Sequence, residues 1–397
     1  MNENGEKSVV QSIVEQLIEN VSKNENSQSF SANKAVVGYV YSEQLLKCVS
    51  CLPKVKGRAL LVDGLIRAFG LHSKMKLLLP VAATDCEMRS FHSEEYLNYI
   101  RRVTQQIASN SEFFADDGEN DFGLSYDCAP IPHLYEIVSQ IAGSSLRAAK
   151  AIVSQDCKIA INWFGGWHHA HRDEASGFCY VNDIVLAILY LLSNGYKRIL
   201  YIDLDLHHGD GVEAAFAHSS KVMTVSLHKH EVGFFPGTGG IKDNGFNNIN
   251  VPLKDGIDDE TYVCLFKKVI QIVKSRFDAD AVICQCGGDT LVGDPFDCFN
   301  LTLHGIGNCV QLLISSFDTP FIFFGGGGYN ILNVSRLWTY LTSIILGVHI
   351  NNQIPDHSNF LLYRPSYELH IEKSSRKNLN DSSYLNSLLN TLSDSNY

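Results

Sequence analysis

Short runs of β-branched and aromatic residues alternate along the middle of the chain with longer segments whose apolar residues recur every three or four positions. The short runs predict buried strands, because they are strand-sized and are bounded by turn residues. The predicted strands are Val36–Tyr41, Lys158–Trp163, Arg198–Asp205, Val222–Leu227, Ala281–Gln285 and Pro320–Phe324. The longer segments predict helices, among them His133–Val153, Asn182–Leu192, Glu260–Phe277 and Gly305–Ser315.

This alternation predicts a single α/β domain, residues 35–371, in which a mostly parallel central sheet is flanked by helices on both faces. Two polar segments border the domain, residues 1–34 and residues 372–397. In the first, apolar residues between Val10 and Val21 recur at helical spacing, which favours either a short amphipathic helix or a mostly disordered leader. The second is expected to be a polar C-terminal tail.

Composition and charge narrow the class of protein. Hydrophobic residues make up 45% of the chain and charged residues 19%, a globular mixture that excludes wholesale disorder. The net charge of −11 disfavours direct binding to nucleic acid and suits a cationic partner better. No apolar run reaches the roughly 18 residues of a membrane span, and the first residues do not resemble a secretory signal. The eleven cysteines are expected to be reduced thiols.

Polar, aromatic and glycine residues gather where successive predicted strands end. INW is followed by FGGWHHA, ILYI by DLDLHHGDG, MTVSLH by a loop with GFFPGTG, AVICQ by CGGD, and FIFF by GGGGYN. In open α/β sheets the ligand site lies beyond the carboxyl ends of the strands. The sequence therefore predicts an active site at this edge of the sheet.

Two carboxylates and an imidazole at this edge form a candidate metal site. Asp203, Asp205 and His207 alternate, so they would share one face if the strand continued through them. Asp289 follows another strand, where a lone aspartate would be an ordinary strand-end carboxylate or helix N-cap. Together, Asp205, His207 and Asp289 leave an open coordination position, as catalytic zinc requires. Iron(II), cobalt or manganese would also suit these ligands.

Two adjacent histidines, His168 and His169, lie at the same edge, and the aspartates Asp203 and Asp210 are not needed as metal ligands. A carboxylate fixes the tautomer of an imidazole and raises its basicity. Two histidine–aspartate dyads beside a metal would supply a general base and an acid or electrostatic partner.

Three aromatic residues complete the predicted site. Tyr329 follows four glycines and could donate a hydrogen bond to an oxyanion. Phe178 and Phe235 are either core aromatics or the walls of a narrow apolar slot.

The five motifs, taken together, resemble the class I zinc-dependent histone deacetylases. They are NWFGGWHHAHRDEASGFCYVND, YIDLDLHHGDGVE, FFPGTG, QCGGDTLVGDPFDCFNLT and FGGGGYN, and the likeness extends from about Val36 to Leu369. The resemblance implies an arginase-like α/β deacetylase fold with its active site at the C-terminal ends of the strands. It also implies hydrolysis of N6-acetyl-lysine in histone or non-histone proteins, in the nucleus and the cytoplasm. Within the class, one member in particular resembles the chain at Trp167, Tyr126-Asp127-Cys128, Gly293-Asp294-Pro295 and Asn330.

The family's functional residues carry over onto matching positions. Asp205, His207 and Asp289 match the zinc ligands. His168, paired with Asp203, matches the electrostatic histidine. His169, paired with Asp210, matches the general base and acid, and Tyr329 matches the residue that polarises the acetyl carbonyl. The implied substrate contacts are Asp127 at the rim, Gly177, Phe178 and Phe235 in the acyl-lysine tunnel, and Arg58 in an inner acetate channel. A structural potassium or sodium ion is implied at Asp203, Asp205, His207, Ser226 and Leu227, and part of a second such site at Phe216 and Val222.

The segment that follows GTG, residues 240–248, is shorter than in the family and lacks a glycine–aromatic run. This difference leaves open whether the second cation site is intact and whether the rim of the active site has a different shape. Two other functions also stay open. An amidohydrolase acting on acetylpolyamines would keep the whole metal site. A non-catalytic binder of acetyl-lysine should have lost Tyr329, His169 or a metal ligand, and none is lost. No long charged C-terminal tail is present, so no obligate corepressor complex is expected.

Overall fold

One parallel sheet organises the molecule. The computed structural model describes residues 36–109 and 122–394, and the predicted amphipathic segment near Val10 lies outside them. Within the described residues, the 8-stranded sheet has the order β2-β1-β3-β8-β7-β4-β5-β6, with every neighbouring pair parallel. The strands are β1 Val37–Val40, β2 Lys76–Leu78, β3 Ile159–Asn162, β4 Ile199–Asp203, β5 Val222–Lys229, β6 Asn248–Leu253, β7 Ala281–Gln285 and β8 Phe321–Phe324.

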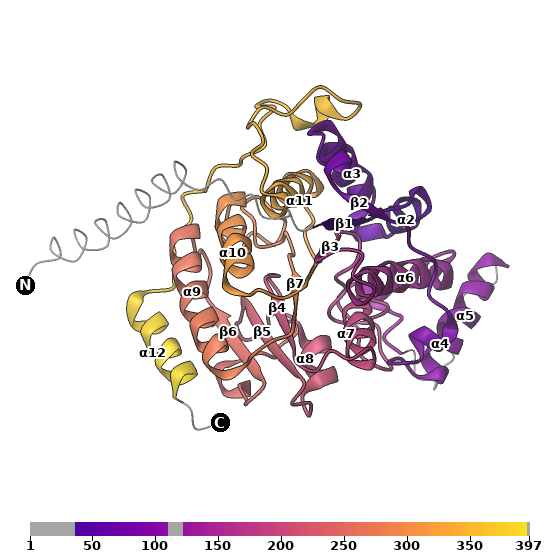
Figure 1. Cartoon of the computed structure of the whole chain (residues 1–397), viewed down its shortest axis with the longest axis horizontal. Helices are drawn as coiled ribbons and strands as arrows, with labels where there is room; N and C mark the ends of the chain where they lie inside the picture. The colour runs from indigo at the N-terminus through magenta and orange to yellow at the C-terminus, as the bar shows by residue number, and fades with distance from the viewer. Residues whose placement is uncertain (1–35, 110–121, 395–397) are drawn as a thin grey trace, which may run out of the picture. The chain divides into compact units, whose positions relative to one another are not determined.

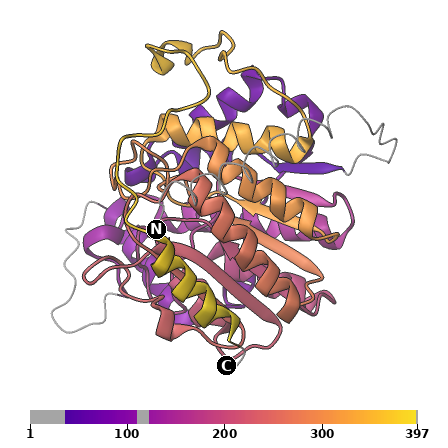
Figure 2. The ribbon, with the colours of Figure 1, turned by 90° about the vertical axis from the view of Figure 1, so that its left-hand side faces the viewer.

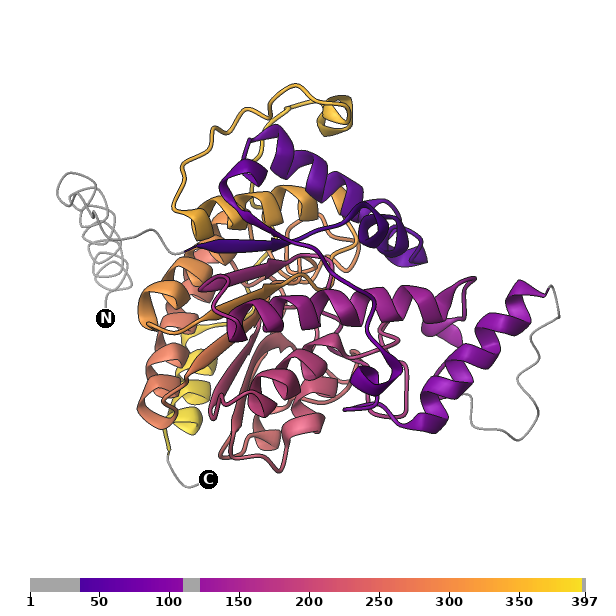
Figure 3. The same cartoon turned by 45° about the vertical axis from the view of Figure 1, so that its right-hand side comes forward.

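Helices cover both faces of this sheet (Figure 1). On one face, α3 packs against α11, α11 against α10, and α10 against α9; on the other, α6 contacts α2 and α7. Figure 3 shows α5, which packs against α6, extending beyond the edge of the sheet. The helices are α2 Glu43–Val49, α3 Arg58–Ala68, α4 Asp85–Met88, α5 Glu94–Ala108, α6 Leu134–Val153, α7 Asp183–Ser193, α8 Asp210–Phe216, α9 Asp259–Arg276, α10 Leu303–Ser316, α11 Ile331–Leu346 and α12 Ser382–Ser393. The arginase-like α/β fold expected from the sequence is therefore confirmed.

Local sequence explains where these elements begin and end. The side chain of Asp258 caps α9 by accepting a hydrogen bond from the backbone N–H of Thr261, and Asp259 and Glu260 occupy its first turn. Lys274 and Arg276 lie in its last turn, where positive charge complements the helix dipole. Strands such as β4 and β7 are buried along their whole length, which accounts for their nearly continuous apolar sequences.

The core braces the loops that leave the sheet. The Trp163 ring, directly after β3, stacks on Trp338 of α11 with centroids 5.7 Å apart and planes 8° apart. The indole N–H of Trp338 donates to the carbonyl oxygen of Cys286 at 2.8 Å, just beyond the end of β7. Buried indole rings thus hold the backbone at the points where it leaves β3 and β7. The loops that contain the predicted site residues begin at these two points.

Two strands were not among the predicted ones, and one helix lies in a segment that was expected to be a polar tail. β2 has only three residues at the edge of the sheet, and β6, with the sequence NINVPL, contains polar residues and a proline. Within residues 372–394, the segment expected to be a polar tail forms α12, which packs against α9 (Figure 2) and buries Leu388 and Leu392. Among the described helices, none has the length and apolar character needed to span a bilayer.

Candidate active site and metal centre

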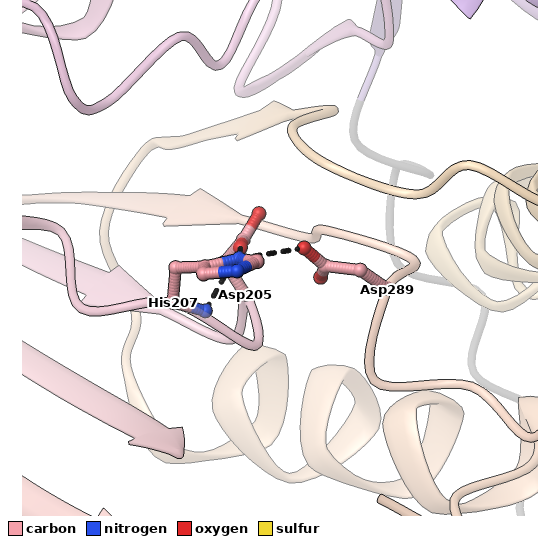
Figure 4. Close-up of side chains that lie close together, drawn as sticks. All are labelled: Asp205, His207 and Asp289. Atoms are coloured by element: carbon pink, nitrogen blue, oxygen red, sulfur yellow. Dashed lines mark hydrogen bonds and ion pairs between the residues drawn. The ribbon is translucent and has the colours of Figure 1, made fainter. Parts of the chain in front are cut away.

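Three side chains expected to bind a metal converge at the carboxyl edge of the sheet. Asp205 and His207 lie in the loop after β4, and Asp289 lies in the loop after the neighbouring strand β7. One ligand atom from each residue lies within 4.8 Å of those from the other two, and all three residues are buried. Figure 4 shows the side chains turned toward one another, with the Nδ1 atom of His207 3.1 Å from the Oδ2 atom of Asp289.

The backbone between these ligands differs from the sequence prediction in one respect. β4 ends at Asp203 instead of continuing to Asp205, so strand alternation does not place the ligands. The side chains of the aspartates bond to the backbone two residues ahead. The Asp205 N–H donates to Oδ1 of Asp203, and the His207 N–H donates to Oδ1 of Asp205, each at 3.1 Å. Such turns are a usual role of aspartate and give the loop its shape.

Neighbouring strands and glycines hold the carboxylates in place. The side-chain amide of Gln285 donates to Oδ2 of Asp205 at 2.7 Å, and the backbone N–H of Gly327 donates to the same oxygen at 2.9 Å. A Cβ atom at Gly287 would collide with the Asp205 carboxylate, and one at Gly327 would collide with that of Asp289. The glycines of CGGD and GGGG are therefore required by close approach of the backbone to the ligands.

The electrostatics of the triad fit a divalent cation. Burial and the negative charge of Asp205 raise the pKa of Asp289 to about 7. Buried carboxylates are unfavourable unless they are paired or coordinate a metal. Two such groups and one imidazole, converging within coordinating reach, match a site with three protein ligands.

Both predicted histidine–aspartate dyads form beside the triad. The Nδ1 atom of His168 lies 2.7 Å from Oδ2 of Asp203, and the Nδ1 atom of His169 lies 2.6 Å from Oδ1 of Asp210. The Tyr201 hydroxyl also donates to Asp203, at 2.6 Å. The two imidazole rings are adjacent, with centroids 4.0 Å apart.

The two dyads differ in charge. Burial lowers the pKa of His168, but the negative charges of Asp203 and Asp205 outweigh this effect and raise the pKa to about 9. For His169, burial and the neighbouring charge of His168 lower the pKa to about 4, despite the bond to Asp210. At neutral pH, His168 is therefore cationic and His169 is a neutral imidazole that can accept a proton.

Phe178 and Phe235 each pack against one of the predicted site residues. The Phe178 ring meets Tyr329 edge-on with centroids 5.6 Å apart, and the Phe235 ring meets His169 in the same way at 4.9 Å. Gly177 fits between His169 and Phe235, because a Cβ atom there would touch both side chains. Phe178 thus packs against the predicted oxyanion donor Tyr329, and Phe235 packs against the predicted general base His169.

Two further rings contact the predicted metal ligand His207, and sequence reasoning had not singled them out. Phe296 lies edge-on to His207 at 4.7 Å and to Tyr329 at 5.3 Å. Phe234 stacks on His207 at 5.3 Å with planes 6° apart. Both rings belong to the quoted motifs FFPGTG and GDPFDCF, which place them in loops near the site but do not indicate which residues they contact.

Buried charges position Tyr329 and the glycines before it. The carboxylate of Asp294 accepts the backbone N–H groups of Tyr329 at 2.7 Å and Asn330 at 3.2 Å. Arg58, the first residue of α3, donates to the carbonyl oxygens of Gly326, Gly327 and Gly328. Its pKa is lowered by burial to about 10, which leaves it charged at neutral pH. The sequence analysis named Asp294 only as part of a tripeptide that carries the resemblance, without a role in the site.

The rim residue Asp127 lies at the outer end of this arrangement. It is exposed in the short 3-10 helix η3, Tyr126–Cys128. Together with Lys54, Trp167 and Phe178 it lines a hollow of about 110 Å³. A larger hollow of about 620 Å³ lies between α9 and α12 and contains none of the predicted site residues.

The residues predicted to bind monovalent cations fall into two groups. Asp203 and Ser226 are aligned on the paired strands β4 and β5, and Leu227 is next along β5. Phe216 ends α8, and Val222 is the first residue of β5, so these two lie toward the opposite end of that strand. Residues 240–248, the shortened segment, form the 3-10 helix η4, Ile241–Asp243, and lead into β6. The two cation sites stay predictions.

Comparison of the sequence with known proteins identifies the family of the chain. Residues 52–345 match the histone deacetylase domain. The chain belongs to the histone deacetylase family. It is 43% identical over 375 residues to histone deacetylase 8 of Danio rerio, covering 93% of this chain and 97% of that protein. It is 43% identical over 361 residues to histone deacetylase 8 of Xenopus tropicalis, covering 89% of this chain and 96% of that protein. For histone deacetylase 1 of Homo sapiens the identity is 42% over 338 residues, 84% of this chain and 69% of that protein.

Membership in the family confirms two expectations from the sequence. The class I resemblance holds, and the member suggested by Trp167, Tyr126-Asp127-Cys128 and Asn330 is histone deacetylase 8. The chain is a metal-dependent hydrolase of amide bonds, as histone deacetylases are. The family implies a divalent metal, and the buried triad Asp205, His207 and Asp289 could supply three ligands for it.

Proposed function

We propose that this histone deacetylase uses zinc to hydrolyse the acetyl amide of N6-acetyl-lysine in histones or other proteins. One observation carries the proposal: the two histidine–aspartate dyads, His168–Asp203 and His169–Asp210, flank the buried triad, and Tyr329 lies at the same site. Amide hydrolysis needs a proton acceptor for water, stabilisation of an oxyanion and a proton for the leaving amine. These side chains can supply all three.

In the proposed mechanism each side chain has one task. A zinc ion held by Asp205, His207 and Asp289 would polarise the acetyl carbonyl and lower the pKa of water. His169 accepts a proton from the attacking water and later delivers it to the departing lysine amine. His168 stays charged beside Asp203 and stabilises the negative charge that develops. Tyr329 donates its hydroxyl proton in a hydrogen bond to the oxyanion.

The aromatic rings of the site and the net charge of the chain support a proposed substrate and cellular location. The rings of Phe178 and Phe235 favour the apolar stem of a neutral acetyl-lysine and disfavour the charged product amine. The net charge of −11 favours basic protein segments such as histone tails. We therefore infer a nuclear role on histone tails, which extends to acetylated proteins elsewhere in the cell.

Turnover on two acetylated amines tests the substrate class. We expect the zinc-reconstituted protein to hydrolyse an acetyl-lysine peptide with a kcat/KM at least about tenfold above that for N-acetylputrescine. A preference for N-acetylputrescine would instead assign the chain to the acetylpolyamine amidohydrolases. Binding of the peptide without any turnover would indicate a non-catalytic acetyl-lysine binder.

Asp127 offers a second discriminating measurement. A carboxylate at the rim can accept two adjacent backbone N–H groups of a peptide, and such charge-assisted bonds are stronger than neutral ones. Asp127→Ala is therefore expected to reduce kcat/KM for acetyl-lysine within a peptide far more than for a minimal acetyl-lysine amide without backbone donors. Asp127→Asn, which keeps an acceptor oxygen, should give an intermediate loss. Equal losses on both substrates would show that Asp127 only supports its own turn.

A further inference from the structure

Two buried histidines anchor the loop that carries Phe235. We propose that His208 and His228 are positioning residues that fix this loop, Gly233–Gly239, and thereby set how large an acyl group the enzyme accepts. The inference rests on the proposed function, since it concerns the wall of the acyl-lysine tunnel. Neither histidine is a metal ligand in the triad or a member of the two dyads.

His208 links the loop to the body of the protein through both ring nitrogens. It is only 2% exposed, and its Nε2 atom lies 3.1 Å from Oε2 of Glu213, on α8. Its Nδ1 atom lies 2.8 Å from the hydroxyl of Thr238, in the loop. A carboxylate only accepts hydrogen bonds, so Nε2 carries a proton and donates to Glu213, while Nδ1 forms the hydrogen bond with the Thr238 hydroxyl. Glu213 is itself fixed by the side-chain amide of Asn250, which donates to the same oxygen at 2.9 Å.

His228 anchors the end of the loop through its backbone. The ring is fully buried, and burial holds its pKa well below the usual value, so it is neutral. Its Nε2–H donates to the carbonyl oxygen of Gly239 at 2.9 Å, and its Nδ1 accepts the Ser226 hydroxyl at 2.8 Å. Gly239 has a φ of +83°, and a Cβ atom there would collide with both His228 and His208. The loop backbone therefore passes directly over the two rings.

The anchored loop carries the rings that contact the catalytic residues. Phe234 stacks on the metal ligand His207, and Phe235 packs against the proposed base His169. Phe235 is itself 40% exposed, so its position depends in part on how the loop backbone is held. Loosening the Thr238 end of the loop would let Phe235 move away from His169 and widen the tunnel. His208 and His228 thus act on substrates through Phe235, without touching them.

Thr238 allows the anchor to be weakened without disturbing buried residues. Thr238→Val keeps the side-chain shape but removes the hydroxyl that meets His208, whereas Thr238→Ser keeps the hydroxyl and serves as the matched control. We measure kcat/KM on one peptide bearing acetyl-lysine and on the same peptide bearing butyryl-lysine. Thr238→Val is expected to lower the acetyl-to-butyryl ratio by about fivefold, the factor that one hydrogen bond represents, while Thr238→Ser keeps the wild-type ratio.

Hydrogen exchange measures the loop independently of catalysis. Backbone amides of residues 233–239 should exchange faster in Thr238→Val than in wild type or Thr238→Ser, with exchange in α8 unchanged. Equal losses on both acyl substrates, or unchanged exchange in the loop, would overturn the proposal. A wild-type protein without deacetylase activity would refute the proposed function instead, and the exchange experiment would still report on the anchor.

Discussion

Asp205→Ala and Asp289→Ala are each expected to abolish divalent-metal binding and deacetylation together. Each substitution removes one of three protein ligands whose coordinating atoms lie within 4.8 Å of one another. The loss cannot be made up by a neighbour, because Asp203 already binds His168 and Asp294 binds the backbone of Tyr329. Metal content of the purified variants, and zinc binding by titration calorimetry, should both fall to background.

The design needs a control for the loss of a carboxylate and another for folding. Asp278→Ala removes an exposed aspartate that precedes β7, whose following loop contains Asp289, and should keep metal and activity. The thermal unfolding of the metal-free proteins tests whether the ligand variants still fold. Asp289→Ala relieves repulsion with Asp205, whereas Asp205→Ala leaves the donors of Gln285 and Gly327 without an acceptor, so Asp289→Ala should be the more stable variant. Full metal occupancy in Asp205→Ala or Asp289→Ala would show that the ligands have been misassigned.

The convergence of Asp205, His207 and Asp289 could be predicted from sequence because these residues lie in the loops that directly follow β4 and β7. Carboxyl ends of parallel strands meet at one edge of a sheet, so Asp205 and Asp289 come together although they are far apart along the chain. The pairing of His168 with Asp203 and of His169 with Asp210 follows from the same edge. The detailed reason given for the ligand geometry was nevertheless wrong, since β4 ends at Asp203 and side-chain-capped turns place Asp205 and His207.

Residues that act through contacts across the fold were beyond sequence reasoning. Gln285 is the last residue of an otherwise apolar strand, and nothing in that pattern says that its amide holds Asp205. Phe296 contacts His207 and Tyr329 only because the loop after β7 turns back over the site. α12 illustrates the same limit, because its burial of Leu388 and Leu392 depends on α9, which no local pattern reveals.

Tyr329 is held where its hydroxyl can serve as a donor. Its backbone N–H is anchored by Asp294, and its ring lies between Phe178 and Phe296. Burial, together with the negative charges of Asp289 and Asp205, raises the pKa of the phenol well above its usual value. The hydroxyl therefore keeps its proton at neutral pH and can donate a hydrogen bond to a developing oxyanion without ionising.

Tyr329→Phe should lower kcat by about two orders of magnitude or more, with peptide binding largely kept. The substitution preserves the ring contacts with Phe178 and Phe296 but removes the donor, and loss of one oxyanion donor typically reduces turnover by about 10² to 10³. The matched control is Tyr384→Phe. It removes a hydroxyl on α12 that donates a hydrogen bond to the carbonyl oxygen of Pro252, and it should leave kcat unchanged. Steady-state kinetics and peptide affinity, measured at equal metal content, separate the two effects. Unchanged kcat with weaker binding would make Tyr329 a wall of the tunnel, because an oxyanion donor acts on the transition state and not on bound substrate.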